Sequence, residues 1–344
     1  MTRIGLACNA ATQARCLHDA VRARVEALGA FVVETFDRPS SWDEPPPEDA
    51  ETRRRFVAFA RDLDLVMISH GAPRIDGAIL DAAPRLRFVG ELEGDRFARR
   101  IDVDAAARRG VKVVDTTHGS STPVAEWALA MMMIGLRNAG SLFRRMIAGE
   151  IITQESKRAD PGYLRGELTG KRVGLIACGH IGRRLLELLE PFRCDVLIHD
   201  PHLPRLIADI YDVTLTSLDA VLSRSDVVVC LAPLTPETRG MIGRRELDLL
   251  RAGAVLVNVS RGAVVDSQAL IVRLQRGDII ACLDVFDPEP VPADSPVRTM
   301  PNVFLTPHIA GVTADCGPRF VDLMVDEMRR FLEGHETRHD LRPR

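Results

Sequence analysis

Short apolar segments alternate with amphipathic segments along most of this chain, and no other feature constrains its fold as strongly. In a parallel sheet each strand leads into a crossover helix, and strands buried on both faces are nearly continuous apolar runs. The alternation therefore predicts an α/β protein with doubly wound parallel sheets. The predicted strands lie at 4–7, 30–33, 65–68, 86–89, 111–114, 172–177, 195–198, 226–229, 254–259, 281–285 and 303–305.

Two longer segments have helical patterns of their own. Residues 124–148 are rich in Ala, Leu and Met, and three consecutive methionines leave no polar face, so we expect one long helix that is covered on most sides. Residues 321–332 predict a last amphipathic helix, whereas 153–166 are polar and irregular.

Length and charge set broad limits on the protein class. The chain has 344 residues and a formal net charge of −3. At roughly 150 residues per domain, this length predicts two domains. The charge gives no basic field for a nucleic-acid partner. No segment reaches the about 20 apolar residues of a membrane helix, and the first residues resemble a strand rather than a signal peptide. We therefore expect a cytoplasmic protein with no membrane partner.

The cysteines are scattered singly, without the close pairing of a zinc site. We expect reduced, buried thiols and no metal. The seven are Cys8, Cys16, Cys178, Cys194, Cys230, Cys282 and Cys316.

A glycine turn follows the strand predicted at 172–177 and precedes a helical segment. A strand, a glycine turn and a helix N-terminus together favour a bound pyrophosphate, because backbone N–H groups and the helix dipole attract the anion. Alanine stands where the first of the three usual glycines is expected, and we expect its φ to be negative. The turn and its candidate cofactor contacts are Ala177, Gly179, His180, Ile181 and Gly182.

Asp200 lies at the end of the next strand, 18 residues after Gly182. An acidic residue at this place binds a ribose 2′-hydroxyl and repels a 2′-phosphate, which favours NAD over NADP. The alternative is that Asp200 and Pro201 only begin a turn. Further cofactor contacts are expected at the ends of later strands, from Ala232, Pro233, Thr238, Ser260 and Asp284.

Three chemically suited side chains follow the later strands: Arg261, Glu289 and His308. The carboxyl ends of parallel strands meet at one edge of a sheet, which is where ligands bind. An arginine can hold a substrate carboxylate, an imidazolium can protonate an alkoxide, and a carboxylate can orient the imidazole. These are the groups that reduction of a 2-oxo acid requires. Taken singly, a strand-end arginine is usually solvated, and Glu289 with Pro290 could form a simple turn.

On these motifs the sequence resembles the D-isomer-specific 2-hydroxyacid dehydrogenase family. The likeness runs from about residue 60 to 335, and 124–126 fits the family's interdomain helix. The matching stretches are 173–182, 231–240, 257–266, 283–290 and 306–308.

The resemblance implies that Arg261, Glu289 and His308 are catalytic. It implies a Rossmann NAD domain at 119–309 and a flavodoxin-like substrate domain made of 1–118 and 310–344. It also implies a homodimer joined through the nucleotide domain.

The segment after the strand at 86–89 departs from the family, which has a short glycine-rich loop there that grips the substrate carboxylate. Here residues 90–102 form a longer, charged segment. One of its arginines could hold a second anionic group on the substrate, or Glu91, Glu93 and Asp95 could neutralise them on a solvated surface. The candidate substrate-binding residues are His70, Gly71, Gly94, Arg96 and Arg99.

We therefore expect an NAD-dependent oxidoreductase that acts on a small 2-oxo or 2-hydroxy acid. The alternative is an NAD-binding, corepressor-like interaction protein with little or no dehydrogenase activity. An NADP-linked glyoxylate or hydroxypyruvate reductase is disfavoured by Asp200.

Overall fold

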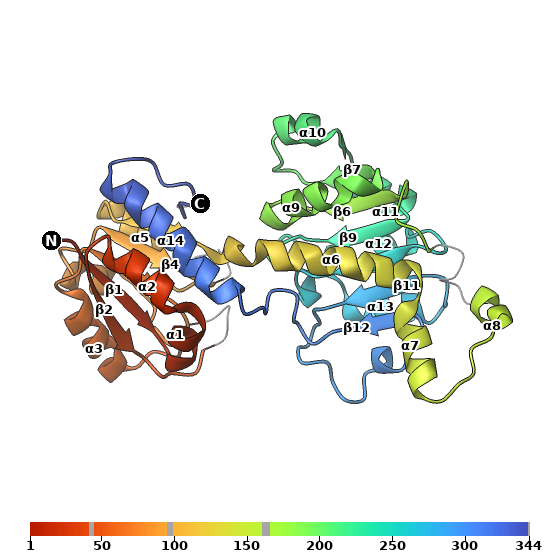
Figure 1. Ribbon diagram of the computed structural model, residues 1–344, viewed down its shortest axis with the longest axis horizontal. Helices are drawn as coiled ribbons and strands as arrows, with labels where there is room; N and C mark the ends of the chain where they lie inside the picture. Colours follow the sequence, from red (N-terminus) through yellow and green to blue (C-terminus); the bar gives the residue numbers. More distant parts are fainter. Residues whose placement is uncertain (41–44, 95–98, 160–165, 343–344) are drawn as a thin grey trace. The chain divides into compact units, whose positions relative to one another are not determined.

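The computed structural model describes residues 1–40, 45–94, 99–159 and 166–342. The chain divides into two compact units, one made of Met1–Ser120 and Thr313–Arg344 and the other of Ser121–Val312. Each unit is built around its own parallel sheet, so the α/β prediction is confirmed (Figure 1).

The first unit has a five-stranded sheet in the order β2-β1-β3-β4-β5. This order is that of flavodoxin-like folds, in which ligands bind where the order reverses, here between β1 and β3. Register pairs Ile4 of β1 with Phe31 on one side and with Leu65 on the other. The strands are β1 (Arg3–Cys8), β2 (Ala30–Thr35), β3 (Leu65–Ile68), β4 (Phe88–Glu91) and β5 (Lys112–Asp115).

Helices cover both faces of this sheet. The C-terminal helix α14 packs against α1 and α2, so segments from the two ends of the sequence share one core (Figure 1). The chain end then runs along β5, where the Leu341 amide donates to the Val113 carbonyl at 3.0 Å. The helices are α1 (Ala10–Cys16), α2 (Asp19–Glu26), α3 (Ala50–Ala60), α4 (Gly77–Ala82), α5 (Val103–Arg108) and α14 (Cys316–Leu332).

The second unit has a seven-stranded sheet in the order β12-β11-β10-β9-β6-β7-β8. The chain builds outward from β6 through β7 and β8, and then returns to add β9 to β12 on the other side. This is the Rossmann arrangement, whose reversal of order lies between β6 and β9. The strands are β6 (Arg172–Ile176), β7 (Asp195–His199), β8 (Thr214–Leu215), β9 (Val227–Cys230), β10 (Val255–Asn258), β11 (Ile280–Leu283) and β12 (Val303–Leu305). The two-residue β8 was not predicted.

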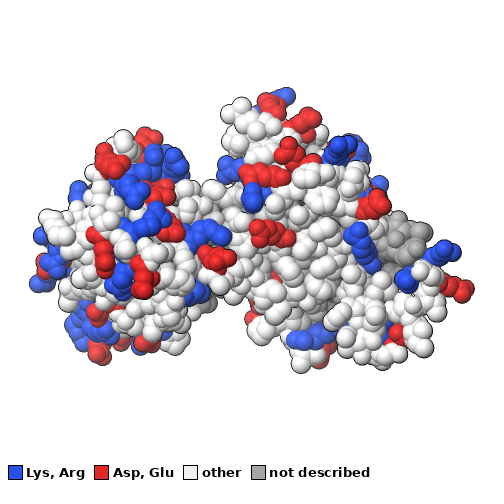
Figure 2. Space-filling view, in the orientation of Figure 1, with Lys and Arg blue, Asp and Glu red and all other residues white. Residues whose placement is uncertain are grey.

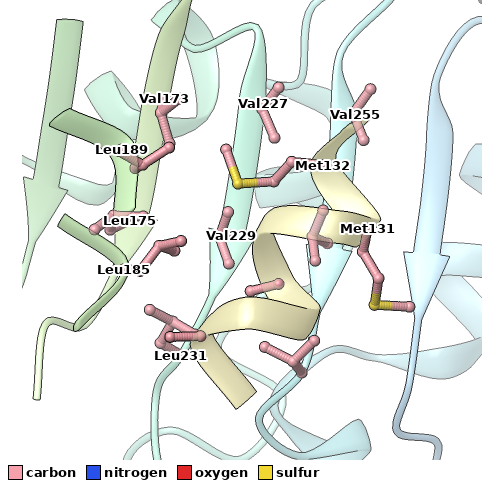
Figure 3. Close-up of a cluster of buried hydrophobic side chains, with 14 of the residues drawn as sticks. Met131, Met132, Val173, Leu175, Leu185, Leu189, Val227, Val229, Leu231 and Val255 are labelled. Carbon is pink, nitrogen blue, oxygen red and sulfur yellow. The ribbon is translucent and has the colours of Figure 1, made fainter. Parts of the chain in front are cut away.

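Helix α6 lies across the middle of this sheet and packs on α9, β10 and β11. Met131 and Met132 are fully buried among strand residues such as Val173, Val227 and Val255 (Figure 3). Most of the contacts that bury α6, as its sequence predicted, therefore come from strands and helices of its own unit. The helices of the unit are α6 (Ser121–Leu136), α7 (Ala139–Ile147), α8 (Gln154–Ala159), α9 (His180–Leu189), α10 (Arg205–Tyr211), α11 (Leu218–Arg224), α12 (Arg244–Asp248) and α13 (Ser267–Leu274).

The prediction of one long helix over 124–148 is wrong, because α6 and α7 are separate. Asn138 lies between them with φ 44°, in the left-handed region that asparagine tolerates better than most residues. A short helix, α8, also occupies part of the stretch 153–166, which was predicted to be irregular.

In the described part of the chain, no helix is both long enough and apolar enough to span a membrane. On the face shown in Figure 2, basic and acidic side chains are interspersed.

Candidate active site

The predicted glycine turn lies between β6 and α9, as expected. Gly179 is the N-cap of α9, and the space where a side chain at Gly179 would project is open. At Gly182 a Cβ would lie only 3.0 Å from Cys178 Sγ, so glycine allows the first turn of α9 to pack closely on the turn. His180 and Ile181 are the first two residues of α9. An open glycine and a helix N-terminus fit a bound pyrophosphate.

The expected negative φ at Ala177 is wrong: its φ is 71°. This conformation favours glycine, because in other residues the Cβ approaches a neighbouring carbonyl oxygen. The surrounding structure holds it, since the Ala177 amide donates to the His199 carbonyl at 2.8 Å.

Asp200 immediately follows β7 and lies beside the glycine turn. Its Oδ2 accepts a hydrogen bond from the Cys178 amide at 2.8 Å, and its Oδ1 accepts one from the His202 amide at 2.8 Å. Asp200 therefore begins a turn and also links the end of β7 to the turn after β6.

His308 and Glu289 form a close pair beyond the ends of β12 and β11. Nδ1 of His308 lies 2.7 Å from Oε1 of Glu289, and the two side chains are 28% and 37% exposed. The pair is thus hydrogen-bonded yet open to a ligand.

Asp284 holds the segment that carries His308. It is completely buried and accepts hydrogen bonds from the Ile309 amide (3.0 Å), the Ala310 amide (2.9 Å) and the Thr306 hydroxyl (2.5 Å). Its carbonyl also accepts from the His308 amide at 2.9 Å. Asp284 stays a predicted cofactor contact, and its carboxylate accepts these three hydrogen bonds in the structure.

Arg261 follows β10, which is next to β11 in the sheet. Its Nη1 donates to the Ser260 carbonyl at 2.6 Å, and its own carbonyl accepts from the Asn258 side chain at 3.1 Å. A Cβ at Gly262 would lie 1.9 Å from the backbone of Phe286, so glycine permits the chain after β11 to pass directly beside Arg261. Sheet order therefore brings Arg261, Glu289 and His308 to one edge, from three neighbouring strands.

The other predicted cofactor residues lie beyond β9 and β10. The Leu231 amide donates to the Ile176 carbonyl at 2.9 Å, which places buried Ala232 beside the glycine turn. Thr238 closes a tight turn by donating to the Pro233 carbonyl at 2.5 Å. Ser260 is 5% exposed and bonds to Asn258 within its own loop.

In the first unit, His70 and Gly71 follow β3, at the reversal of strand order. Gly71 has φ 89°, and its amide donates to Ser40 Oγ at 3.0 Å. His70 Nε2 lies 3.5 Å from Oε2 of Glu93. The Gly94 amide donates to Thr117 Oγ1 at 2.8 Å, so the structure gives this amide a protein partner.

The charged segment after β4 is partly folded inward. Arg100 and Glu91 form an ion pair at 3.1 Å with side chains only 1% and 2% exposed, whereas Arg99 is exposed. Arg96 lies outside the described residues.

Glu93 also pairs with Arg15. Sequence reasoning did not select Arg15, because it belongs to an amphipathic stretch. The signal that could have selected it is its place in α1, the helix that follows β1. Burial tends to raise the pKa of Glu93, but its hydrogen bond with His70 and the charge of Arg15 outweigh burial and lower that pKa.

All seven cysteines are free thiols. Six are buried, as predicted, whereas the prediction is wrong for Cys194, which is only half-buried. Burial and the nearby charge of Asp200 raise the pKa of Cys178 to about 12, so this thiol is not a nucleophile at neutral pH. Among the described residues, no group of three His, Cys, Asp or Glu side chains is arranged to bind a metal.

Comparisons with family models, curated proteins and solved structures agree on one family. Residues 129–310 match the model for D-isomer specific 2-hydroxyacid dehydrogenase, NAD binding domain. The glyoxylate reductase of Aeropyrum pernix is 32% identical over 294 residues, which cover 85% of this chain and 86% of that protein. The mitochondrial formate dehydrogenase of Hordeum vulgare is 36% identical over 242 residues, covering 69% of this chain and 62% of that one.

Several curated relatives are longer than the region they share, so the chain spans only 49% to 62% of their length. Among solved structures, a phosphoglycerate oxidoreductase from Rhizobium etli has a TM-score of 0.81 at 22% identity, covering 100% of this chain and 98% of that chain, and supports the fold. Residues 129–310 match the family's NAD binding domain, and the chain belongs to the D-isomer specific 2-hydroxyacid dehydrogenase family.

Proposed function

We propose that this protein is an NAD-dependent dehydrogenase that interconverts a small 2-oxo acid and the matching 2-hydroxy acid. The observation that carries the proposal is the pair of His308 and Glu289, 2.7 Å apart at the same sheet edge as Arg261 and in the same unit as the glycine turn. NADH, when bound, supplies the hydride. The chain's own residues bind the acid and move the proton.

His308 is the proposed proton donor in the reductive direction. Its Nδ1 faces Glu289, so we assign the proton transfer to the oxygen of the reacting carbonyl to the other ring nitrogen, Nε2. Glu289 orients the ring and stabilises the imidazolium by its charge. In the oxidative direction the same nitrogen accepts the hydroxyl proton.

Arg261 is the proposed carboxylate ligand. A guanidinium offers paired N–H donors that match a carboxylate, and its charge also polarises the adjacent carbonyl. The hydrogen bond from Nη1 to the Ser260 carbonyl uses one of these donors and helps to orient the side chain.

The proposed cofactor contacts are the glycine turn, Asp200 and the loops after β9 and β10. With Asp200 at the ribose, NADH is expected to bind at least about tenfold more tightly than NADPH. Equal affinities for the two cofactors would contradict this assignment.

The proposed substrate domain is 1–118 with 310–344, and the proposed NAD domain is 119–309. In the first, His70, Gly71, Gly94 and Arg99 are the described candidates for substrate contacts. The seven free thiols support a reducing compartment such as the cytoplasm.

A panel of 2-oxo acids assayed by NADH oxidation tests the function. The panel should include glyoxylate, pyruvate, hydroxypyruvate and acids with a second carboxylate or a phosphate, since the exposed Arg99 is a candidate ligand for such a group. Turnover of any of these supports the proposal. NADH binding without turnover of any of them would instead favour the corepressor-like function, which the charged segment after β4 also fits.

A further inference from the structure

The glycine turn contains a conformation that its own residue type does not favour. Ala177 has φ 71°, and an isolated alanine at this position would relax toward negative φ. Such a relaxation would rotate the peptide between Ala177 and Cys178, and with it the amides that lead into α9. Something outside the turn must therefore hold that peptide.

Two consecutive residues at the end of β7 hold the two peptides that flank Ala177. The His199 carbonyl accepts from the Ala177 amide at 2.8 Å, and Oδ2 of Asp200 accepts from the Cys178 amide at 2.8 Å. The first bond extends the β6–β7 ladder. The second depends on the carboxylate, because no backbone group in the described part of the chain accepts from the Cys178 amide.

The carboxylate is itself fixed, and so is the residue it holds. Oδ1 of Asp200 accepts from the His202 amide at 2.8 Å, so both oxygens are anchored. Cys178 is buried, and a Cβ at Gly182 would lie 3.0 Å from its Sγ, so the start of α9 rests directly on Cys178. A shift of Cys178 would therefore displace the helix N-terminus.

We propose that Asp200 is a positioning residue for the pyrophosphate turn, in addition to its proposed contact with the ribose. This inference rests on the proposed NAD binding at this turn. It means that the ribose and pyrophosphate parts of the site share one carboxylate. Replacing Asp200 to admit NADPH would then weaken the binding of both cofactors.

The first test separates the two roles with a cofactor that lacks the ribose hydroxyls. Asp200→Ala is titrated with NADH and with its 2′,3′-dideoxyadenosine analogue. If Asp200 acted only on the hydroxyls, the Kd of the analogue would not change. We expect the analogue to bind at least about fivefold more weakly to the variant. A change of less than twofold would overturn the proposal. Asp195→Ala is the matched control, because Asp195 starts the same strand and pairs with Arg172 at 2.6 Å.

The second test removes the need for the anchor. Glycine adopts φ 71° without strain, so Ala177→Gly should keep the turn in place when Asp200 is absent. We expect Ala177→Gly to raise the thermal unfolding midpoint and to restore the analogue's affinity for Asp200→Ala to within about threefold of wild type. A double variant that binds as weakly as Asp200→Ala would contradict the proposal.

The unfolding midpoints of the ligand-free single and double variants give a readout that does not depend on NADH. Asp200→Ala should lower the midpoint less in the Ala177→Gly background than in wild type, and equal decreases would contradict the anchoring role. A wild-type protein that binds no NADH would refute the proposed function, while this comparison would still report on the anchor.

Discussion

At the scale of single residues, the proposed proton transfer depends most on His308. Its ring is oriented by Glu289, and its backbone is held by the buried Asp284. His308 has φ 53°, so the tertiary structure keeps it in a conformation that most residues avoid. Such conformations are retained where the surrounding structure fixes them, and they cluster at functional sites.

His308→Ala should lower kcat for 2-oxo acid reduction by at least about a hundredfold, because it removes the proton donor. The Kd of NADH should change little, since the lost interaction belongs to proton transfer. Steady-state kinetics and a fluorescence titration measure the two quantities. His335→Ala, at a 62% exposed side chain, is the control. Full turnover by His308→Ala would remove His308 from the mechanism.

Glu289→Gln should lower kcat for reduction by about tenfold or more, because the ring of His308 loses the carboxylate that orients it. Steady-state kinetics measure the change. The control is Glu333→Gln, since Glu333 lies 3.8 Å from His335 on the surface and its loss should leave kcat unchanged. A wild-type kcat for Glu289→Gln as well would mean that the pair has no role in proton transfer.

Sequence reasoning placed His308 and Glu289 together because each follows a strand of the same parallel sheet. The two strands, β12 and β11, are neighbours in that sheet, which brings the two side chains into contact. Sequence reasoning failed at Ala177, where residue type predicts a negative φ but hydrogen bonds from the next strand decide otherwise. It also did not predict the hydrogen bonds that the Asp284 carboxylate accepts. The donors of these bonds lie more than 20 residues away in the sequence and reach Asp284 only in the folded chain.

At the scale of elements, the segments that follow β1, β3 and β4 meet in one ionic cluster. Arg15, His70 and Glu93 come from these three segments, and Glu93 contacts both of the others. The pattern of alternating elements predicted the strands but not the cluster, because contacts among loop side chains leave no periodic signal. The break between α6 and α7 was missed for a similar reason, since Asn138 interrupts the helix without changing its apolar composition.

Glu93→Gln tests this cluster through the pH dependence of stability. Burial raises the pKa of Glu93, but His70 and Arg15 lower it further, so the folded pKa lies below the unfolded value of about 4.3. A lowered folded pKa means that the stabilisation is complete above the unfolded pKa and is lost as pH falls through the folded pKa. Thermal midpoints should therefore differ between wild type and Glu93→Gln at pH 7 and converge at acidic pH, as the pH falls through the folded pKa.

The control for this measurement is Glu34→Gln, which removes an exposed ion pair with Arg55 in the same unit. Exposed pairs contribute little, so its midpoint should stay close to that of wild type at both pH values. A constant difference between wild type and Glu93→Gln across the pH range would mean that the charge of Glu93 is not what stabilises the cluster.

At the scale of the whole molecule, the alternation of apolar and amphipathic segments predicted the parallel α/β architecture, and the length of the chain predicted two domains. The Rossmann and flavodoxin-like folds of the two units came from the family resemblance and not from the alternation. Local patterns also do not say what covers an exposed face. Figure 2 shows a largely uncharged surface along α6 in the second unit. Four large apolar side chains are exposed on α7 and just after it: Phe143 (66%), Met146 (66%), Ile147 (74%) and Ile151 (88%).

We expect this apolar surface to join two copies of the chain in a homodimer. Stable interfaces remove about 800 Å² from each partner, and their centres are rich in aromatic residues and methionine. Helix α7 is also firmly attached to its own unit, since Arg144 donates to the Met300 and Val303 carbonyls at 2.7 and 3.2 Å.

Replacing Phe143 and Ile147 together by aspartate should therefore give a monomer in sedimentation equilibrium that still binds NADH. The same replacement of Leu206 and Ile210, a comparably exposed apolar pair on α10, should leave the dimer intact. A monomeric wild type, or a dimer that survives the α7 change, would show that another partner or none covers this surface.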